Sequence, residues 1–227
     1  MADACSNCGE KITDGGFLSG PNPRLSDGSL RIINFVNGTE AEEMCNKCGS
    51  GASANAAYAI DNERDRIKSG LRKVALDFPM MTIGALPGSA DFRVLGMVTA
   101  NVTVGTGLFN EFSQGFSDFV GAVNTQSGMA SKVNKGEAAA RQLLVQRAMQ
   151  LGANSIIGVD VDYGVTNNNA ATVNMQGTAV RIANLSAVLG EEACKAAEWL
   201  GWAWGRLNKL DRWALGDIHE GEVWAAS

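Results

Sequence analysis

The sequence is poor in the residues that most enzymes use for catalysis. Its 227 residues include one histidine, His219, four prolines and only 19% charged side chains. Histidine is the side chain that titrates near neutral pH, and the catalytic triads of hydrolases depend on it. A single histidine therefore excludes most triads, dyads and histidine-based metal sites. We expect a protein that is not an enzyme, with no catalytic residues and no organic cofactor.

Basic charge and long apolar runs are scarce as well. Nineteen Lys and Arg against 24 Asp and Glu give a formal net charge of -5, whereas proteins that coat nucleic acid need surplus cations to hold phosphates. The longest uncharged runs, 94–110 and 163–180, contain Asn, Thr and Gly throughout, which do not suit a membrane interior. The first residues lack the basic and apolar regions of a signal peptide. We expect a cytoplasmic protein that binds neither nucleic acid nor membranes.

Apolar residues are nevertheless abundant enough for a packed core. They make up 45% of the chain, which is usual for globular domains, and 227 residues suit two modules better than one. Shifts in composition divide the sequence into four predicted parts. These are a loop-rich part at 1–51, a connecting helix at 52–78, a central domain at 79–184 and a Trp-rich helix and tail at 185–227.

Four of the five cysteines form two Cys-x-x-Cys-Gly motifs in the first part. Cys5 and Cys8 make the first motif, and Cys45 and Cys48 make the second, with 36 residues between them. The two-residue gap lets both thiolates of a motif face one point, and four thiolates complete the tetrahedral shell of a structural Zn²⁺. The pair resembles a zinc ribbon, in which the apolar run 30–36 is expected to be one strand of a hairpin.

Other uses of the four cysteines remain as alternatives. Disulfides belong to oxidising compartments, which the expected cytoplasmic location disfavours. An iron–sulfur or redox site is the second alternative, but nothing near the motifs resembles a catalytic group. The fifth cysteine, Cys194, has no histidine partner, so we interpret it as a small buried apolar residue.

Residues 79–184 show both strand and helix periodicity. Stretches rich in β-branched residues predict strands, and a 3.6-residue apolar period predicts helices. The predicted strands are 94–104 with a bulge at Gly96, 155–163 and 172–182. One predicted helix spans 137–151, with Gly152 as its C-cap. A second predicted helix carries a core stripe of four aromatic rings, Phe109, Phe112, Phe116 and Phe119. A Gly-rich loop over 121–136 is expected between the two helices. This order indicates an α+β domain.

All five tryptophans lie in the last part of the chain. The segment 191–213 has helical periodicity, with acidic residues at its start and basic residues at its end, as the helix dipole favours. Its predicted apolar stripe leaves Trp202 and Trp213 outside, so we expect the helix to pack against something on more than one face. We expect a protein partner to bind either to the zinc ribbon or to a surface formed by tryptophans of this helix. The tryptophans of that surface are Trp199, Trp202, Trp204 and Trp213.

The central domain resembles the YbjQ-like family of bacterial and phage proteins, which carry the label heavy-metal-binding. The resemblance covers about residues 80–183. It rests on the segments Leu95–Thr99, Ala148–Leu151, Gly152–Tyr163 and Gly177–Val180. It implies a small α+β domain that assembles into a ring, usually a pentamer, in which strands and helices of neighbouring subunits complete one another. It implies no particular reaction.

The family label points to metal, yet residues 80–183 contain neither Cys nor His. A site for soft metals inside this domain is therefore not expected. Only Asp160 and Asp162 are candidate oxygen ligands. They share one face of the predicted strand, since residues i and i+2 of a strand point to the same side. In a ring, the copies of this pair would form a band of carboxylates. The alternative is a polar strand edge held by hydrogen bonds.

Together these features predict a non-enzymatic, homo-oligomeric scaffold or protein-interaction module with structural zinc. A metal-ion or small-ligand binding protein with sites between subunits is the alternative. An enzyme that uses carboxylates is the third hypothesis, but no pair of acids has the spacing of a known catalytic motif.

Overall fold

The computed structural model describes residues 4–14, 20–104, 129–165 and 170–224. They fall into two compact units, residues 1–67 with 205–227 (unit 1) and residues 68–204 (unit 2). Two helices, α2 (Asn46–Val74) and α4 (Glu191–Ala214), each contribute one part to either unit. The predicted boundaries at 51, 78 and 184 stay predictions.

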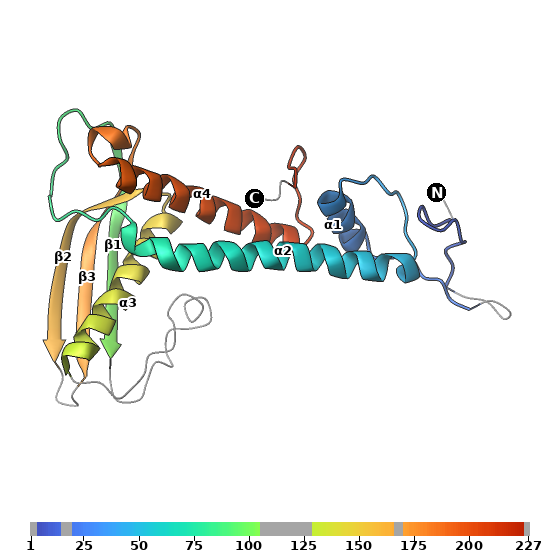
Figure 1. The fold of residues 1–227 in the computed structure, drawn as a ribbon, viewed down its shortest axis with the longest axis horizontal. Helices are drawn as coiled ribbons and strands as arrows, with labels where there is room; N and C mark the ends of the chain where they lie inside the picture. The colour runs from blue at the N-terminus through green and yellow to red at the C-terminus, as the bar shows by residue number, and fades with distance from the viewer. Residues whose placement is uncertain (1–3, 15–19, 105–128, 166–169, 225–227) are drawn as a thin grey trace. The chain divides into compact units, whose positions relative to one another are not determined.

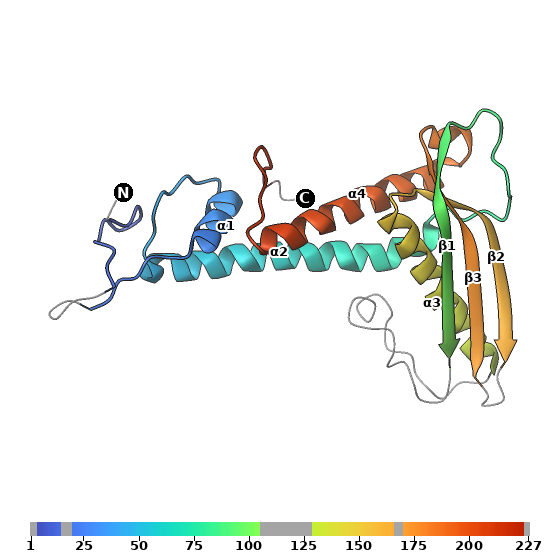
Figure 2. The same cartoon turned by 180° about the vertical axis from the view of Figure 1, so that it is seen from behind.

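Unit 2 is built on a three-stranded antiparallel sheet with the order β1-β3-β2. The strands are β1 (Phe92–Val104), β2 (Ser155–Val165) and β3 (Ala171–Ile182). Alternate residues of β1 from Val98 to Val104 are buried, as expected for a strand with one covered face. The helix α3 (Met129–Gln150) covers that face (Figures 1 and 2). The predicted α+β class and all three predicted strands are confirmed.

The bulge predicted at Gly96 is also confirmed. The register of β1 against β3 shifts between Val94 and Gly96, and Gly96 has φ 153, which only glycine adopts readily. Close packing explains a second glycine. A Cβ built on Gly136 of α3 would lie 3.0 Å from Val173 and 3.3 Å from Val104, so the helix approaches the sheet where no side chain intervenes.

Two predictions for this unit need comment. The loop predicted over 121–136 is wrong for 129–136, because α3 already begins at Met129. Gly136 is buried against Val173 and Val104 of the sheet, and this packing outweighs the low helix propensity of glycine. The stripe of Phe109, Phe112, Phe116 and Phe119 and the loop residues 121–128 lie outside the described residues.

The outer edge of β2 is covered along its first half. The backbone of residues 79–83 runs beside it, with the N–H of Ile156 donating to Pro79 at 2.9 Å and that of Val159 donating to Met81 at 3.0 Å. Met80 forms a parallel bridge with Ile156. From Asp160 onward, no described backbone group bonds to this edge.

Unit 1 contains a helix where a strand was expected. The run 30–36 lies in α1 (Asp27–Asn37), so the predicted ribbon strand is wrong. Ser26 caps the first turn by accepting from the N–H of Ser29 at 3.2 Å, and Gly38, with φ 63, ends the helix. Leu30 and Ile33 face Leu25 and Ala56. A short apolar run fits either period, and here the caps and the i, i+3 burial decide it.

The helix predicted at 191–213 is α4, and the helix predicted from residue 52 is α2, which begins six residues earlier. In unit 2, the ring of Trp199 lies against Gly70, where a Cβ would come within 2.6 Å of it. In unit 1, Trp213 lies outside the main apolar stripe of α4 and is nevertheless only 1% exposed, so this helix packs on more than one face, as the sequence predicts. None of the helices in the described ranges is apolar and long enough to cross a membrane.

Candidate metal centre

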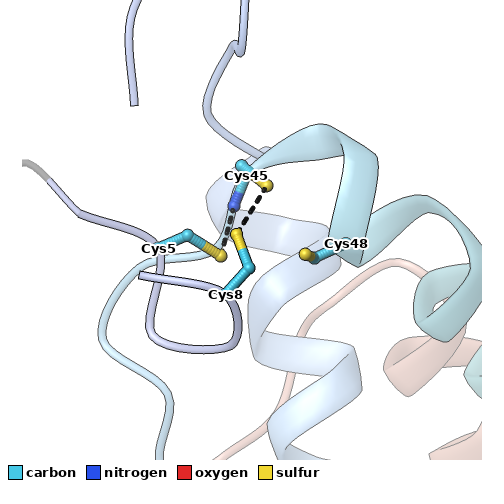
Figure 3. A group of neighbouring side chains, drawn as sticks. All are labelled: Cys5, Cys8, Cys45 and Cys48. Atoms are coloured by element: carbon cyan, nitrogen blue, oxygen red, sulfur yellow. Dashed lines mark hydrogen bonds between the residues drawn. The ribbon is translucent and has the colours of Figure 1, made fainter. Parts of the chain in front are cut away.

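The four motif cysteines come from two segments of unit 1. Cys5 and Cys8 lie in a loop closed by the antiparallel bridge between Ala4 and Lys11. Cys45 precedes α2, and Cys48 lies in its first turn. Figure 3 shows the four side chains turned toward one another. The structure therefore brings all four predicted ligands together.

The sulfur positions suit a tetrahedral metal ion. All four sulfurs lie within 4.8 Å of one another, and those of Cys8 and Cys45 are 3.9 Å apart. A tetrahedron with Zn–S bonds of about 2.3 Å has edges of about 3.8 Å. Cys5 and Cys45 are buried, Cys48 is half-buried and Cys8 is exposed. The cluster therefore sits at the surface with one side open to solvent.

Backbone groups fix the loops that carry the sulfurs. Ser6 and Glu43 tie the two segments together, since the N–H of Ser6 donates to the Glu43 carbonyl at 2.8 Å and the N–H of Glu43 donates to the Ser6 hydroxyl at 3.2 Å. The N–H of Asn46 donates to the Pro23 carbonyl at 2.7 Å. Backbone hydrogen bonds therefore join the two segments that carry the cysteines.

The two motif glycines have different physical roles. Gly9 has φ 72, a left-handed conformation that closes the first loop. Gly49 lies in α2, where a Cβ would approach the side chain of Leu25 to 2.6 Å. The first glycine therefore permits a turn, and the second permits close packing of the helix on the segment before α1.

The neighbouring groups move the thiol pKa values in opposite directions. Burial raises the pKa of Cys5, but backbone N–H groups of Cys45, Cys8 and Asn7 outweigh it and lower the pKa to about 6. For Cys8, the backbone N–H of Glu10 lowers the pKa, whereas burial and the sulfurs of Cys48, Cys5 and Cys45 raise it to about 12. Four thiolates at this spacing repel one another, so a bound cation is needed to hold all four in the charged form.

The predicted oxygen ligands Asp160 and Asp162 lie elsewhere, in unit 2. Both are exposed on β2, opposite Gln176 and Asn174 of β3. The amide of Gln176 donates to Asp160 at 3.4 Å. Among the described residues, the cysteine cluster is the one group of three or more metal-ligating side chains. Cation binding by the two aspartates stays a prediction.

The structure changes the set of tryptophans that can meet a partner. Trp213 packs edge-on against Phe35 with ring centroids 4.7 Å apart, so this candidate is withdrawn from the predicted surface. Trp202 is 47% exposed, and its ring lies 6.4 Å from that of Trp199. Trp204 is half-buried. Contact of these three with a partner stays a prediction.

Sequence reasoning missed a buried ion pair in unit 1. Arg206 of α4 donates to both carboxylate oxygens of Glu63 of α2, at 2.7 and 3.1 Å. A signal was present, because Glu63 lies three residues after Ile60 on the apolar stripe of its helix. A charge on such a stripe predicts a partner of opposite charge, but its identity depends on how the helices pair.

Comparison with known proteins identifies the central domain. The family described as "YbjQ_1: Putative heavy-metal-binding" matches residues 79–183. A UPF0145 protein of Nostoc punctiforme is 31% identical over 105 residues, which are 44% of this chain and 95% of that protein. A UPF0145 protein of Anoxybacillus flavithermus is 30% identical over 102 residues, covering 44% of this chain and 94% of that protein. Neither name states an enzymatic activity.

A solved structure is similar over the same share of the chain. It is a Pediococcus pentosaceus protein of unknown function, 18% identical, with a TM-score of 0.30, covering 45% of this chain and 95% of that one. The sequence matches extend over nearly the whole length of both UPF0145 relatives. With residues 79–183 as the family domain, this chain belongs to the YbjQ family.

Proposed function

We propose that this protein is a non-enzymatic, homo-oligomeric scaffold that carries a structural Zn²⁺ on its four N-terminal cysteines. The observation that carries the proposal is the set of four sulfurs within 4.8 Å of one another. Four protein ligands fill a tetrahedral shell and leave no open position for a substrate. The metal would therefore hold the fold of unit 1 and perform no reaction.

The donor chemistry supports zinc over the alternatives. Thiolates favour soft or borderline metal ions, and tetrahedral sulfur sites hold zinc or iron–sulfur clusters. A zinc ion bound by Cys5, Cys8, Cys45 and Cys48 would join the loop 4–11 to the start of α2, so metal binding and folding would be coupled. A reducing cytoplasm is the compartment we propose, because it keeps all four thiols available.

The edges of the sheet support assembly into a ring. Within the described residues, no strand pairs with the outer side of β1, a strand of 13 residues, in which Val94 is 57% and Met97 74% exposed. The same holds for the second half of β2, where Tyr163 and Val165 are exposed. Open strand edges pair readily with other strands, and pairing one edge with the other edge of the next copy closes a ring. The family resemblance favours five copies.

A metal-ion or small-ligand binding protein is the second candidate. The family description favours it, and a ring would bring copies of Asp160 and Asp162 together if both strands faced a shared opening. Their exposure leaves them free to bind a hard cation such as Ca²⁺ through oxygen. This candidate predicts a second class of metal site that does not depend on the cysteines.

Native mass spectrometry of the whole chain tests both candidates. We expect a single ring mass with one zinc per subunit, loss of zinc in Cys45→Ser, and no change in Cys194→Ser, which removes a cysteine outside the cluster. A monomer, or a Cys45→Ser protein that keeps one zinc per chain, would contradict the scaffold proposal. Additional metal that is lost in the double variant Asp160→Ala with Asp162→Ala would favour the second candidate.

A further inference from the structure

A second cluster in unit 1 is unrelated to the metal centre and involves the segment after α4. Gly216, with φ 77, reverses the chain, and its carbonyl accepts from Arg31 of α1 at 3.2 Å. Residues 217–224 then form a short segment outside any helix or strand (Figure 2). We call residues 217–224 the strap.

The carboxylate of Glu222 makes the shortest hydrogen bonds between the strap and α4. Glu222 accepts from the indole N–H of Trp213 at 2.7 Å and from the backbone N–H of His219 at 3.0 Å on one oxygen. Its other oxygen accepts from Arg212 at 2.7 Å. These donors outweigh burial and lower the pKa of Glu222 to about 2. Two of these donors, Arg212 and Trp213, belong to α4, and a charged and a neutral donor on opposite oxygens suit recognition of a carboxylate.

The second contact of the strap is made by the indole ring of Trp224, two residues after Glu222. Trp224 lies 5.9 Å from the Trp213 ring and 6.3 Å from Phe35, centroid to centroid. The guanidinium of Arg206 lies 4.6 Å from the Trp213 ring and 5.3 Å from the Trp224 ring. The intervening Val223 is 72% exposed. Inward and outward residues thus alternate as in an extended peptide laid on a surface.

The position of Arg206 is fixed by a residue outside the strap. Glu63 holds its guanidinium through two hydrogen bonds in the plane of the group, so the flat faces stay available for aromatic rings. The side chains that receive Glu222 and Trp224 therefore come from α1 and α4, with Glu63 of α2 holding Arg206. The strap adds a weaker contact through Asp217, whose carbonyl accepts from Arg212 at 3.3 Å.

We propose that Arg206, Arg212, Trp213 and Phe35 form a recognition site for an acidic peptide with the pattern Glu-x-Trp, and that the strap occupies this site in cis. The partner is a protein segment of that chemistry, which binds when the strap is displaced. A tethered ligand acts at an effective concentration in the millimolar range. The strap therefore excludes a dilute partner peptide and acts as an autoinhibitory contact.

The test uses a fluorescein-labelled peptide with the sequence of residues 215–224 and the full-length protein. Fluorescence anisotropy measures its binding to the wild type and to a variant that combines Glu222→Gln with Trp224→Ala. We expect the variant to bind at least about tenfold more tightly than the wild type, because the tethered competitor is removed. Val223→Ala changes an exposed residue of the same strap and is expected to match the wild type.

Further controls make each outcome decisive. Binding should be lost when glutamine replaces the glutamate of the peptide that corresponds to Glu222, and when Arg212→Gln is added to the open variant. The milder variant Glu222→Gln alone covers the case in which the double variant does not fold, and its affinity should lie between the wild type and the open form. No peptide binding to a folded open variant, or equal binding of the glutamine peptide, would overturn the proposal.

Discussion

The two units of this protein are stabilised by different kinds of contact. Unit 2 has a continuous apolar core between the sheet and α3, which includes fully buried residues such as Ala100, Leu144 and Val173. Unit 1 has a smaller apolar cluster around Leu30 and Ile33, and it adds four clustered cysteines, a buried ion pair and a group of aromatic rings. Packing of apolar surface needs no ligand, whereas a cluster of thiolates does. The comparison implies that metal removal damages one unit and spares the other.

The largest expected effect is the loss of a metal ligand. Cys45→Ser removes a buried thiol of the proposed zinc site, and structural zinc contributes on the order of 10 kcal/mol to the folding of small zinc modules. We expect loss of zinc by elemental analysis and rapid hydrogen exchange over residues 4–14 and 20–45. The sheet of unit 2 should keep its protection. Equal loss of protection in both units would contradict the comparison, and Cys194→Ser serves as the matched control.

The next effect concerns the apolar core of unit 2. Leu144 of α3 is fully buried, and truncation of such a leucine typically costs about 2–5 kcal/mol through lost burial and a residual cavity. Leu144→Ala should therefore lower the urea midpoint of unit 2 without releasing zinc. Leu151→Ala, at a leucine that is 47% exposed, should change the stability by less than about 1 kcal/mol. Zinc release from Leu144→Ala would show that the units are coupled.

Acid should weaken the strap before it affects the core. The folded pKa of Glu222, about 2, lies below the usual glutamate value of 4.5, so its stabilisation is present above pH 4.5 and is lost as the pH falls toward 2. Glu222→Gln removes charge-assisted hydrogen bonds worth about 2 kcal/mol and should remove this pH dependence. Hydrogen exchange of residues 217–224 between pH 5 and pH 2.5 measures it. An unchanged pH profile in Glu222→Gln would rule out this carboxylate as the anchor.

The smallest effect compares two helical glycines of unit 2. Alanine usually stabilises a helix relative to glycine by about 0.5–1 kcal/mol. At Gly201 nothing lies within 4 Å of a Cβ, so Gly201→Ala should stabilise by that amount. At Gly136 the Cβ meets Val173 and Val104, and overpacking costs about 1–3 kcal/mol. Thermal unfolding should therefore show opposite shifts in the two variants, and shifts of one sign would contradict the packing of α3 on the sheet.

The comparison also explains which features the sequence predicts. In unit 2 the elements are long and strongly periodic, so the strands and the bulge at Gly96 follow from residues close together in the chain. The clustering of the four cysteines is predictable because the Cys-x-x-Cys spacing has few structural alternatives. The start of α3 was harder to predict from the sequence, because its first turns include Gly136, whose helical conformation depends on the neighbouring sheet.

The errors concentrate in unit 1 for a physical reason. The run 30–36 has no clear period, so the choice of helix over strand depends on Ser26 and on packing against α2. The burial of Trp213 depends on Phe35, which is far from it in sequence, and on the strap, which follows it as a segment outside any helix or strand. Pairs such as Glu63 with Arg206 arise only when two helices meet. Contacts of this kind leave a weak local signal in the sequence.

X-ray absorption at the zinc edge of the purified full-length protein tests whether the four cysteines hold a structural zinc ion. We expect one zinc per chain surrounded by four sulfurs at about 2.3 Å, with no nitrogen or oxygen neighbour. A first shell that contains oxygen or nitrogen would contradict the proposed site. So would a protein isolated without zinc in which the amides of residues 4–14 and 20–45 remain protected from hydrogen exchange.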